Sequence, residues 1–397
     1  MGGPHTSPKL RAMMDDYAHG RVHEPVRFNE STGRWEVLRY VDGLRVISDS
    51  DVFSNDLSEF IPDHEELRNF RKGNFQAMDE PRHRELRGLV TQGFTPKFVQ
   101  SLVPRVERVA AELLDATVER GQKQVDIVAE LAAPLPVIVI AEVMGLPVED
   151  RKLFREWADA LLVDNGVDAL FSEEGVAAMA PSIRAMNEYL LSHVDSYRRS
   201  NKEGMIRDLL CAELNGRTLD DFEILGFLAL LLTAGHLTTS TVLTNTLLCL
   251  DENPGLLEQL RADPALLAPT IEEVMRVRSP LVWIDRRARV DVELGGKQIP
   301  QGSLVSASLV STMRDEAEFV DPDVFDMHRK QARHLAFGKG IHFCLGAPLA
   351  RQEVRIALTA MLERFEDFQV AEGEEIVFHD PKDFNGTKKL PMDLVRR

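Results

Sequence analysis

The chain has 397 residues and a formal net charge of −17 at neutral pH, with 44% hydrophobic and 28% charged residues. This balance is that of a globular protein with enough apolar side chains for a large core, and the excess of acidic residues argues against nucleic-acid binding, which depends on Lys and Arg neutralising phosphates. Three cysteines, Cys211, Cys249 and Cys344, are too few and too scattered for a disulfide framework or a cysteine-rich metal site, so a reducing cytoplasm is expected.

Neither export nor membrane anchoring is indicated. The amino-terminal segment has no apolar run of the kind found in a signal peptide. The longest apolar stretch, residues 227–234, is far shorter than the ~20 residues that a membrane-spanning helix needs. We therefore expect a protein that binds neither a membrane nor nucleic acid.

Helical periodicity dominates the chain. Residues 98–119 place apolar side chains on one face of a helix. Residues 222–250 predict a long apolar helix that follows Thr218 as an N-cap and acidic residues in its first turn. Residues 345–365 again repeat apolar side chains at helical spacing.

Strand signals are fewer and shorter. Alternating or β-branched patterns predict strands at residues 35–40, 290–294 and 303–308. No repeat of solenoid length and no flexible linker is visible. The sequence thus predicts a single mostly helical domain over residues 1–397, with a small β region.

Residues 337–346 gather three glycines, two phenylalanines, a histidine and Cys344 directly before the expected helix at 345–365. Glycines allow tight turns and a close backbone approach. The N–H groups and the dipole at a helix start favour a thiolate. A buried structural cysteine beside a glycine turn is the alternative, but this concentration of residue types favours a metal ligand.

These residues match the haem-binding signature of the cytochromes P450 (Phe-x-x-Gly-x-x-x-Cys-x-Gly) at every fixed position, and on this motif the chain resembles that family. The resemblance implies a mostly α cytochrome P450 fold with a minor β-sheet region. It also implies haem b (iron protoporphyrin IX) with Cys344 as the axial thiolate, a ligand that favours O–O cleavage. Phe337, Gly338 and Gly346 would adjoin the haem.

Four further residues resemble the family's ligands of the haem propionates. Residues 78–87 look like an early helix of the family and put His83 and Arg87 on one face at i, i+4. Arg286 lies at the start of the expected β region, and His342 lies two residues before the cysteine. Such donors would form charge-assisted hydrogen bonds with two carboxylates.

Glu273 and Arg276 stand three residues apart on an expected helix, where the family carries its structural Glu-x-x-Arg motif. This spacing alone is more often a solvated ion pair. The motif implies a later arginine as a third partner, which Arg329 or Arg333 could supply.

The long central helix carries the residues expected on the oxygen side. By resemblance, Ala234 and Gly235 form the small-residue pair that leaves room for O2, and Thr238 is the threonine of an acid–threonine pair that handles protons. Leu237 occupies the acid position, so the carboxylate of such a relay is missing. Ordinary bonding of a threonine hydroxyl to the helix backbone is the alternative for Thr238.

The family's pocket segments carry mainly apolar side chains here, which suit a mid-sized hydrophobic or aromatic substrate. The expected substrate-binding residues are Phe60, Phe75, Leu230, Val282, Trp283, Ile284 and Phe384.

The resemblance implies a cytoplasmic, monomeric monooxygenase that hydroxylates or epoxidises a polyketide-type intermediate of antibiotic biosynthesis, free or carried on an acyl-carrier protein. Since no flavin or iron–sulfur motif occurs, electrons from NAD(P)H would arrive through ferredoxin reductase and ferredoxin. A basic patch could receive this partner, formed by Arg82, Arg84, Lys97, Lys339, Arg351 and Arg355. Two alternatives stay open without the acid: a peroxide-driven peroxygenase, and a non-catalytic haem protein acting as ligand sensor or recruitment scaffold.

Overall fold

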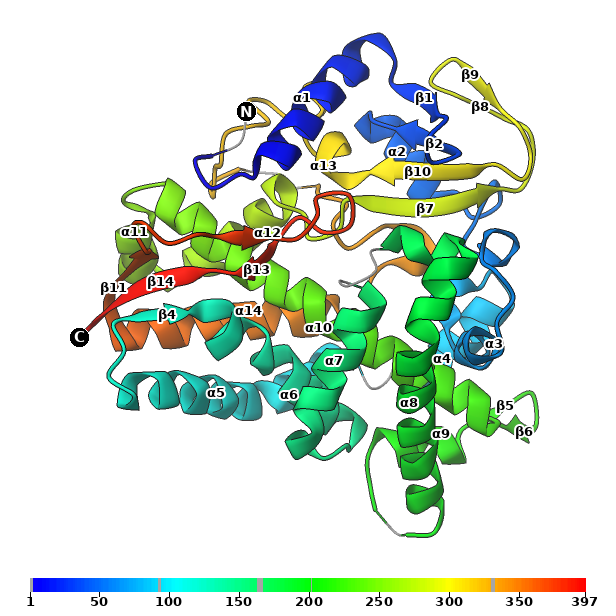
Figure 1. Cartoon of the computed structure of the whole chain (residues 1–397), viewed down its shortest axis with the longest axis horizontal. Coiled ribbons are helices and arrows are strands. Elements are labelled where there is room, and N and C mark those ends of the chain that lie inside the picture. Colours follow the sequence, from blue (N-terminus) through cyan, green and yellow to red (C-terminus); the bar gives the residue numbers. More distant parts are fainter. Residues whose placement is uncertain (1–2, 92–93, 163–166, 201, 330–332) are drawn as a thin grey trace.

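The computed structural model describes residues 3–91, 94–162, 167–200, 202–329 and 333–397. It is mostly helical with a small β region, as the sequence predicts. Figure 1 shows the amino-terminal helix and the largest sheet together at one corner, with the long helices making up most of the remaining molecule.

The largest sheet has five strands in the order β1-β2-β10-β7-β3. The β2 and β10 strands run parallel, and the other pairs are antiparallel. Its strands are β1 (Val26–Asn29), β2 (Arg34–Val37), β3 (Phe53–Ser54), β7 (Trp283–Ala288) and β10 (Leu304–Ser308). The helices α2 (Tyr40–Ser48) and α13 (Leu309–Thr312) pack against this sheet, and α1 (Pro8–His23) packs against α13.

The other strands form a three-stranded sheet, β11-β14-β4, and three hairpins within the described residues. Their bounds are β4 (Gln124–Asp126), β5 (Glu213–Leu214), β6 (Arg217–Thr218), β8 (Val292–Leu294), β9 (Lys297–Ile299), β11 (Phe365–Val370), β12 (Val377–Phe378), β13 (Thr387–Lys389) and β14 (Pro391–Arg396). The strands expected at 290–294 and 303–308 are β8 and β10. The one expected at 35–40 ends at Val37, because Tyr40 already begins α2.

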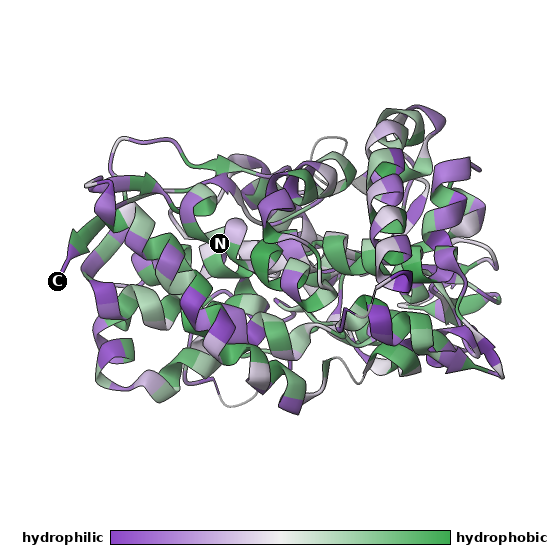
Figure 2. Cartoon of the chain, turned by 90° about the horizontal axis from the view of Figure 1, so that it is seen from below, coloured by the Kyte–Doolittle hydropathy of each residue, from purple (hydrophilic) through white to green (hydrophobic). Residues whose placement is uncertain are grey.

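The helical body consists of α3 (Glu65–Arg71), α4 (Arg82–Thr91), α5 (Pro96–Glu119), α6 (Pro134–Met144), α7 (Arg151–Leu162), α8 (Glu173–Arg198), α9 (Met205–Cys211), α10 (Asp221–Glu252), α11 (Leu256–Ala262), α12 (Leu267–Val277) and α14 (Ala347–Arg364). The predicted helices at 98–119, 222–250 and 345–365 correspond to α5, α10 and α14. Most helices in Figure 2 carry both hydrophobic and hydrophilic residues, so one face can turn to the core.

The α10 helix is the centre of this body, packed against α3, α6, α7, α8, α12 and α14. Among the described helices it alone is long and apolar enough to cross a membrane, yet 78% of its most apolar window is buried inside the fold, as in a core helix. Its N-cap is Asp220, whose side chain accepts the N–H groups of Phe222 and Glu223. Thr218, the predicted cap, instead ends β6.

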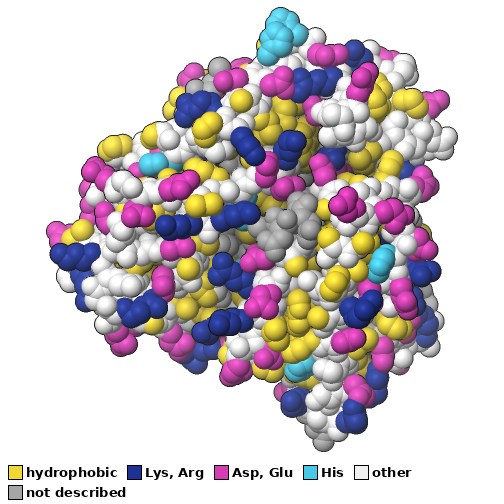
Figure 3. Space-filling view, viewed as in Figure 1, with side chains coloured by type: hydrophobic (Ala, Val, Ile, Leu, Met, Phe, Trp, Pro, Cys, Tyr) yellow, Lys and Arg dark blue, Asp and Glu magenta, His cyan; other side chains and the backbone are white. Residues whose placement is uncertain are grey.

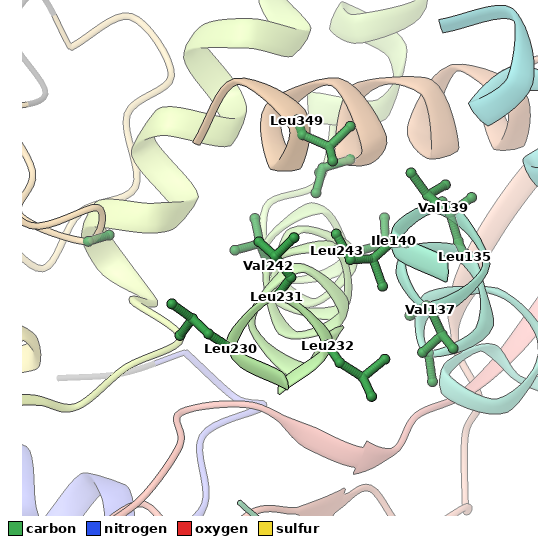
Figure 4. Packing of buried hydrophobic residues seen from close by; sticks show 14 of the residues in the cluster. Leu135, Val137, Val139, Ile140, Leu230, Leu231, Leu232, Val242, Leu243 and Leu349 are labelled. Atoms are coloured by element: carbon green, nitrogen blue, oxygen red, sulfur yellow. The ribbon is translucent and has the colours of Figure 1, made fainter. Parts of the chain in front are cut away.

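Buried side chains from α6, α10 and α14 meet in the interior. In Figure 4, Leu349 points from α14 toward α10, and Ile140 of α6 lies beside Leu243 of α10. These residues belong to one continuous apolar cluster. Because interiors are packed tightly, this contact fixes α14, and the segment that precedes it, against the middle of α10.

Candidate active site

A cavity lies between the middle of α10 and the segment that leads into α14. Its wall is mainly apolar, with a few polar side chains. Thirteen of the predicted site residues line it: Phe75, Arg87, Leu230, Ala234, Gly235, Thr238, Ile284, Arg286, Phe337, Gly338, His342, Cys344 and Gly346. Residues from distant parts of the chain thus converge on one space, which is the arrangement of a ligand site.

Backbone geometry explains the glycines around Cys344. Gly338 and Gly340 adopt φ values of 69° and 73°, a region that residues with a Cβ rarely enter. A Cβ on Gly340 would also lie 3.2 Å from the carbonyl oxygen of Ser48. The Cys344 N–H donates to the Phe337 carbonyl oxygen at 2.8 Å, which closes the turn and directs the thiol to the cavity.

The sulfur of Cys344 lies at the start of α14. Burial raises the pKa of the thiol, whereas the N–H groups of Gly346 and Ala347 and the charge of Arg87 lower it. The side chain is nevertheless accessible from the cavity. A thiolate here would accept two backbone hydrogen bonds and keep its cavity side available to a metal ion.

Two histidines beside the cysteine segment hold unpaired ring nitrogens. The rings of His83 and His342 lie 4.1 Å apart between centroids. The Nε2 atom of each is buried without a hydrogen-bond partner in the described structure. Burial lowers the pKa of both, that of His342 to about 3. Buried polar atoms are nearly always paired in folded proteins, so these nitrogens indicate a ligand.

Two arginines join the histidines. Arg286 is buried, donates from Nη1 to the carbonyl oxygen of Asp285 at 2.8 Å, and has its pKa lowered to about 10 by burial. Arg87 donates to the carbonyl oxygen of Phe343 at 2.5 Å. Cys344, His342 and both arginines line the apolar cavity, whereas His83 is outside its wall and reaches the site through its contact with the His342 ring. This set of a thiol, imidazoles and guanidinium groups fits a flat metal macrocycle with two anionic side arms, which is the chemistry of haem.

On α10, Thr238 lines the cavity and its hydroxyl donates to the carbonyl oxygen of Ala234 at 2.9 Å. The helix-bonded form that the sequence left open is therefore present, and the oxygen can still accept a hydrogen bond. Leu237 is buried and is not part of the cavity wall. His236 is also buried away from the cavity, with a pKa lowered to about 4 by burial.

Four of the predicted substrate residues lie elsewhere in the fold. Val282 packs in a separate cluster with Tyr17, and Trp283 stacks edge-on against that tyrosine at 5.6 Å between centroids. Ile284 of β7 lines the cavity instead, as does Leu281, which precedes this strand. Phe384 is buried against His379, and Phe60 lies in a short 3-10 helix outside the cavity wall.

Several wall residues were missed by sequence reasoning. They are Asn55, Phe94, Ile140, Leu231, Val242, Met275, Leu349 and Glu353, among others. Helical spacing from Thr238 could have suggested Val242, one turn later. Nothing in the local sequence distinguishes Glu353 from a solvated glutamate.

The Glu273–Arg276 pair is buried, with 1% and 0% of the side chains exposed. Arg276 donates to both carboxylate oxygens at 2.7 and 2.8 Å and to three backbone carbonyls. Arg329 supplies the third contact, 3.0 Å from Glu273 Oε1. This decides between the two candidates that the sequence left open, since Arg333 is exposed and, among the described residues, its backbone oxygen accepts from the Tyr40 hydroxyl.

The proposed basic patch is only partly free. Arg351 is paired with Glu272, Arg355 with Gln352, and Arg82 with Glu85 and Glu223. Arg84 is exposed but lies 3.5 Å from Glu80, and Lys97 and Lys339 are exposed. On the face seen in Figure 3, basic and acidic side chains are interspersed, so neither positive nor negative charge dominates this face.

The chain is similar to proteins of one family. The family model described as cytochrome P450 matches residues 45–391. The cyclomarin C epoxidase of Salinispora arenicola is 41% identical over 370 residues, 93% of either chain. The erythromycin C-12 hydroxylase of Saccharopolyspora erythraea is 35% identical over 96% of this chain and 94% of its own.

Solved structures agree. A mutant of P450 EryK in complex with erythromycin B has a TM-score of 0.88 at 34% identity, covering 97% of this chain and 96% of its own. A Bacillus megaterium P450 in complex with testosterone has a TM-score of 0.90 at 32% identity, covering 98% and 99%.

Proposed function

This chain belongs to the cytochrome P450 family, and we propose that it oxidises a polyketide-type natural-product intermediate at a haem b held by Cys344. Members of the family are haem-thiolate monooxygenases that use O2 and electrons supplied from outside. Bound haem would supply the activation of O2 and the transfer of one oxygen atom to the substrate. The protein supplies binding, orientation and proton handling.

The haem-holding residues are proposed from their chemistry. Cys344 would ligate the iron, with Phe337, Gly338 and Gly346 forming the turn beneath it. The haem propionates would form hydrogen bonds with the unpaired imidazole nitrogens of His83 and His342 and with the guanidinium groups of Arg87 and Arg286. The unpaired Nε2 atoms of the two histidines are the single observation that carries this assignment.

On the opposite wall, Thr238 would hold a proton at Oγ1, and Ala234 with Gly235 would leave room for O2. A Cβ on Gly235 would approach nothing closer than 3.6 Å, so the protein itself does not require glycine here. The missing side chain of Gly235 would instead leave this part of the cavity open for O2.

The substrate would be orientated by the apolar wall, where Phe75, Leu230 and Ile284 are retained from the sequence prediction and Leu231 and Leu281 are added. Such a wall excludes water and favours a mid-sized hydrophobic compound. Relatives that act on cyclomarin C and erythromycin support a natural-product intermediate, hydroxylated or epoxidised. It would be free or carried on an acyl-carrier protein.

Residues 1–397 would form a single catalytic domain, monomeric and cytoplasmic. Electrons would pass from NAD(P)H through ferredoxin reductase and ferredoxin to the side of Arg84, Lys97 and Lys339. The epoxidase and the hydroxylase named above support a monooxygenase over a peroxide-driven peroxygenase or a non-catalytic haem protein.

The test is a binding and turnover screen of the haem-loaded protein. Natural-product intermediates that shift the haem absorption spectrum would be incubated with ferredoxin, ferredoxin reductase, NADPH and labelled O2. We expect a product that carries one labelled oxygen atom. A compound that binds but gives product with hydrogen peroxide alone, and none with the electron-transfer chain, would contradict the proposal.

A further inference from the structure

Two glycines lie where the segment after α3 crosses the first turns of α10. A Cβ on Gly226 of α10 would lie 2.6 Å from the Gly73 nitrogen and still closer to the carbonyl oxygen of Phe70. A Cβ on Gly73 would lie 2.8 Å from the Phe227 nitrogen and still closer to the carbonyl oxygen of Glu223. All of these obstructing atoms belong to the backbone, so no change of side-chain rotamer makes room for a larger residue.

The close approach is what requires glycine at both positions. Gly226 lies inside α10, where backbone conformation favours alanine over glycine. Gly73 is not among the described glycines with a positive φ, so its backbone conformation is open to other residues. Each glycine is therefore explained by the backbone that faces it.

Side chains hold the same segment against α10. The ammonium group of Lys72 lies 4.7 Å from the ring centroid of Phe222. The ring of Phe75 stacks on that of Phe227, with 6.0 Å between centroids. Since both partners belong to the first turns of α10, residues 70–77 are fixed along this part of the helix.

Phe75 connects this contact to the cavity. Its ring is buried, lines the cavity, and lies 6.0 Å from both the ring of His83 and the guanidinium carbon of Arg87. Leu230, one turn after Gly226 on α10, lines the cavity too. The separation of residues 70–77 from α10 thus determines how far the Phe75 ring projects into the cavity.

We propose that the contact between Gly73 and Gly226 sets the size selectivity of the cavity, because it holds Phe75 in the wall and so limits the bulk of the substrate. This inference rests on the proposed function, since it takes the cavity as the substrate site. Gly226→Ala would push residues 70–77 outward by about 1 Å, because ordinary Cβ contacts begin near 3.4 Å. Phe75 would move out with them. Both glycines are positioning residues and do not touch the substrate.

The experiment compares Gly226→Ala with the parent and with Gly88→Ala as a matched control. Gly88 lies within α4, and a Cβ there would meet nothing within 4 Å. The haem-loaded proteins are titrated with phenylimidazole, a small probe, and with clotrimazole, a bulky one. Both bind haem iron and change its absorption spectrum.

The measured quantity is the ratio of clotrimazole affinity to phenylimidazole affinity. In Gly226→Ala this ratio should rise by roughly ten-fold, because a displaced Phe75 leaves room for the bulky probe and fewer contacts for the small one. Gly88→Ala should keep the parental ratio. An equal loss of affinity for both probes in Gly226→Ala would indicate a weakened fold alone and would contradict the proposal.

A second variant removes the wall without disturbing the backbone contact. Phe75→Ala deletes the ring and should raise the affinity ratio in the same direction. Adding Gly226→Ala to Phe75→Ala should then change the ratio little, because both act through one side chain. A parental ratio in Phe75→Ala would overturn the proposal whether or not Gly226→Ala takes up haem.

Amide hydrogen exchange gives a readout that needs neither probe nor turnover. The N–H groups of Phe75, Ala77 and Met78 donate to carbonyl oxygens within the segment. They should exchange slowly in the parent and in Gly88→Ala, and faster in Gly226→Ala. Free exchange of residues 70–77 in the parent would overturn the proposal. A parent that binds both probes but forms no oxygenated product would instead contradict the proposed function, while the affinity ratios would still stand.

Discussion

Glu273→Ala should be one of the most destabilising single changes in this chain. The carboxylate takes two hydrogen bonds from Arg276, one from Arg329 and one from the Asp326 N–H. Alanine would leave a fully buried guanidinium with backbone carbonyls as its partners. Removing one member of a buried pair costs about 3–5 kcal/mol, a large part of the roughly 5–15 kcal/mol that stabilises a domain.

The neighbouring residue provides a matched control. Glu272 pairs with Arg351 and His334, but 30% of its side chain is exposed. Although burial opposes it, hydrogen bonds from Arg351 and His334 lower the pKa of Glu272 to about 2, so Glu272→Ala should also cost stability, but solvent screens this partly exposed pair. Urea denaturation should therefore show Glu273→Ala to be the less stable of the two variants. Glu273→Gln, which keeps one acceptor oxygen, should fall between them.

The same assay tests the third partner. Arg329→Ala removes a contact to Glu273 and should destabilise the fold, whereas Arg333→Ala removes an exposed side chain and should not. Equal denaturation midpoints for Glu273→Ala and Glu272→Ala would refute the view that this pair holds the fold together.

Four other outcomes follow from the site. Cys344→Ser should lose the thiolate-type absorption band of the reduced carbon monoxide complex, while Cys211→Ser and Cys249→Ser keep it. Thr238→Ala should divert reducing equivalents to hydrogen peroxide, measured as product per NADPH, and His236→Ala should leave that ratio nearly unchanged. Because burial raises the pKa of Glu353 from the 4.5 of an ordinary glutamate to about 8 in the fold, the folded state binds an extra proton between these pH values. Stability of the haem-free protein should thus fall as pH rises through this window, by up to about 5 kcal/mol, and a denaturation series should be flatter in Glu353→Gln. The proposed propionate ligands are His83, Arg87, Arg286 and His342. An alanine variant of any of them should release haem to a competing apoprotein more readily, because a buried anion loses a hydrogen-bond donor worth about 1–3 kcal/mol.

Features encoded locally could be predicted from the sequence. The apolar periodicity of α5, α10 and α14 is carried by residues within each helix, so their bounds were close to those observed. The turn around Cys344 is likewise set by glycines within ten residues of it. Thirteen predicted site residues do line the cavity, because the family signature fixes which segments meet there.

Features set by packing could not be predicted in this way. The phase of β7 decides that Ile284 faces the cavity and Trp283 faces Tyr17, and nothing in residues 281–284, all apolar or aromatic, specifies that phase. The choice of Arg329 over Arg333 depends on how the segment after α13 folds back on α12. Both are basic residues four apart, equally plausible until their surroundings are known.

The buried carboxyl of Glu353 is a feature that no single sequence segment predicts. Along α10 alone, a leucine at position 237 indicates only that the acid of the family's acid–threonine pair is missing. A cavity, however, is lined by several elements, and α14 contributes a carboxyl more than a hundred positions later in the chain. Glutamates on helices are usually solvated, so its burial depends on α5, α10 and α12 surrounding α14. Since those contacts also raise its pKa, the proton-holding property belongs to the packing of these helices and not to any sequence segment.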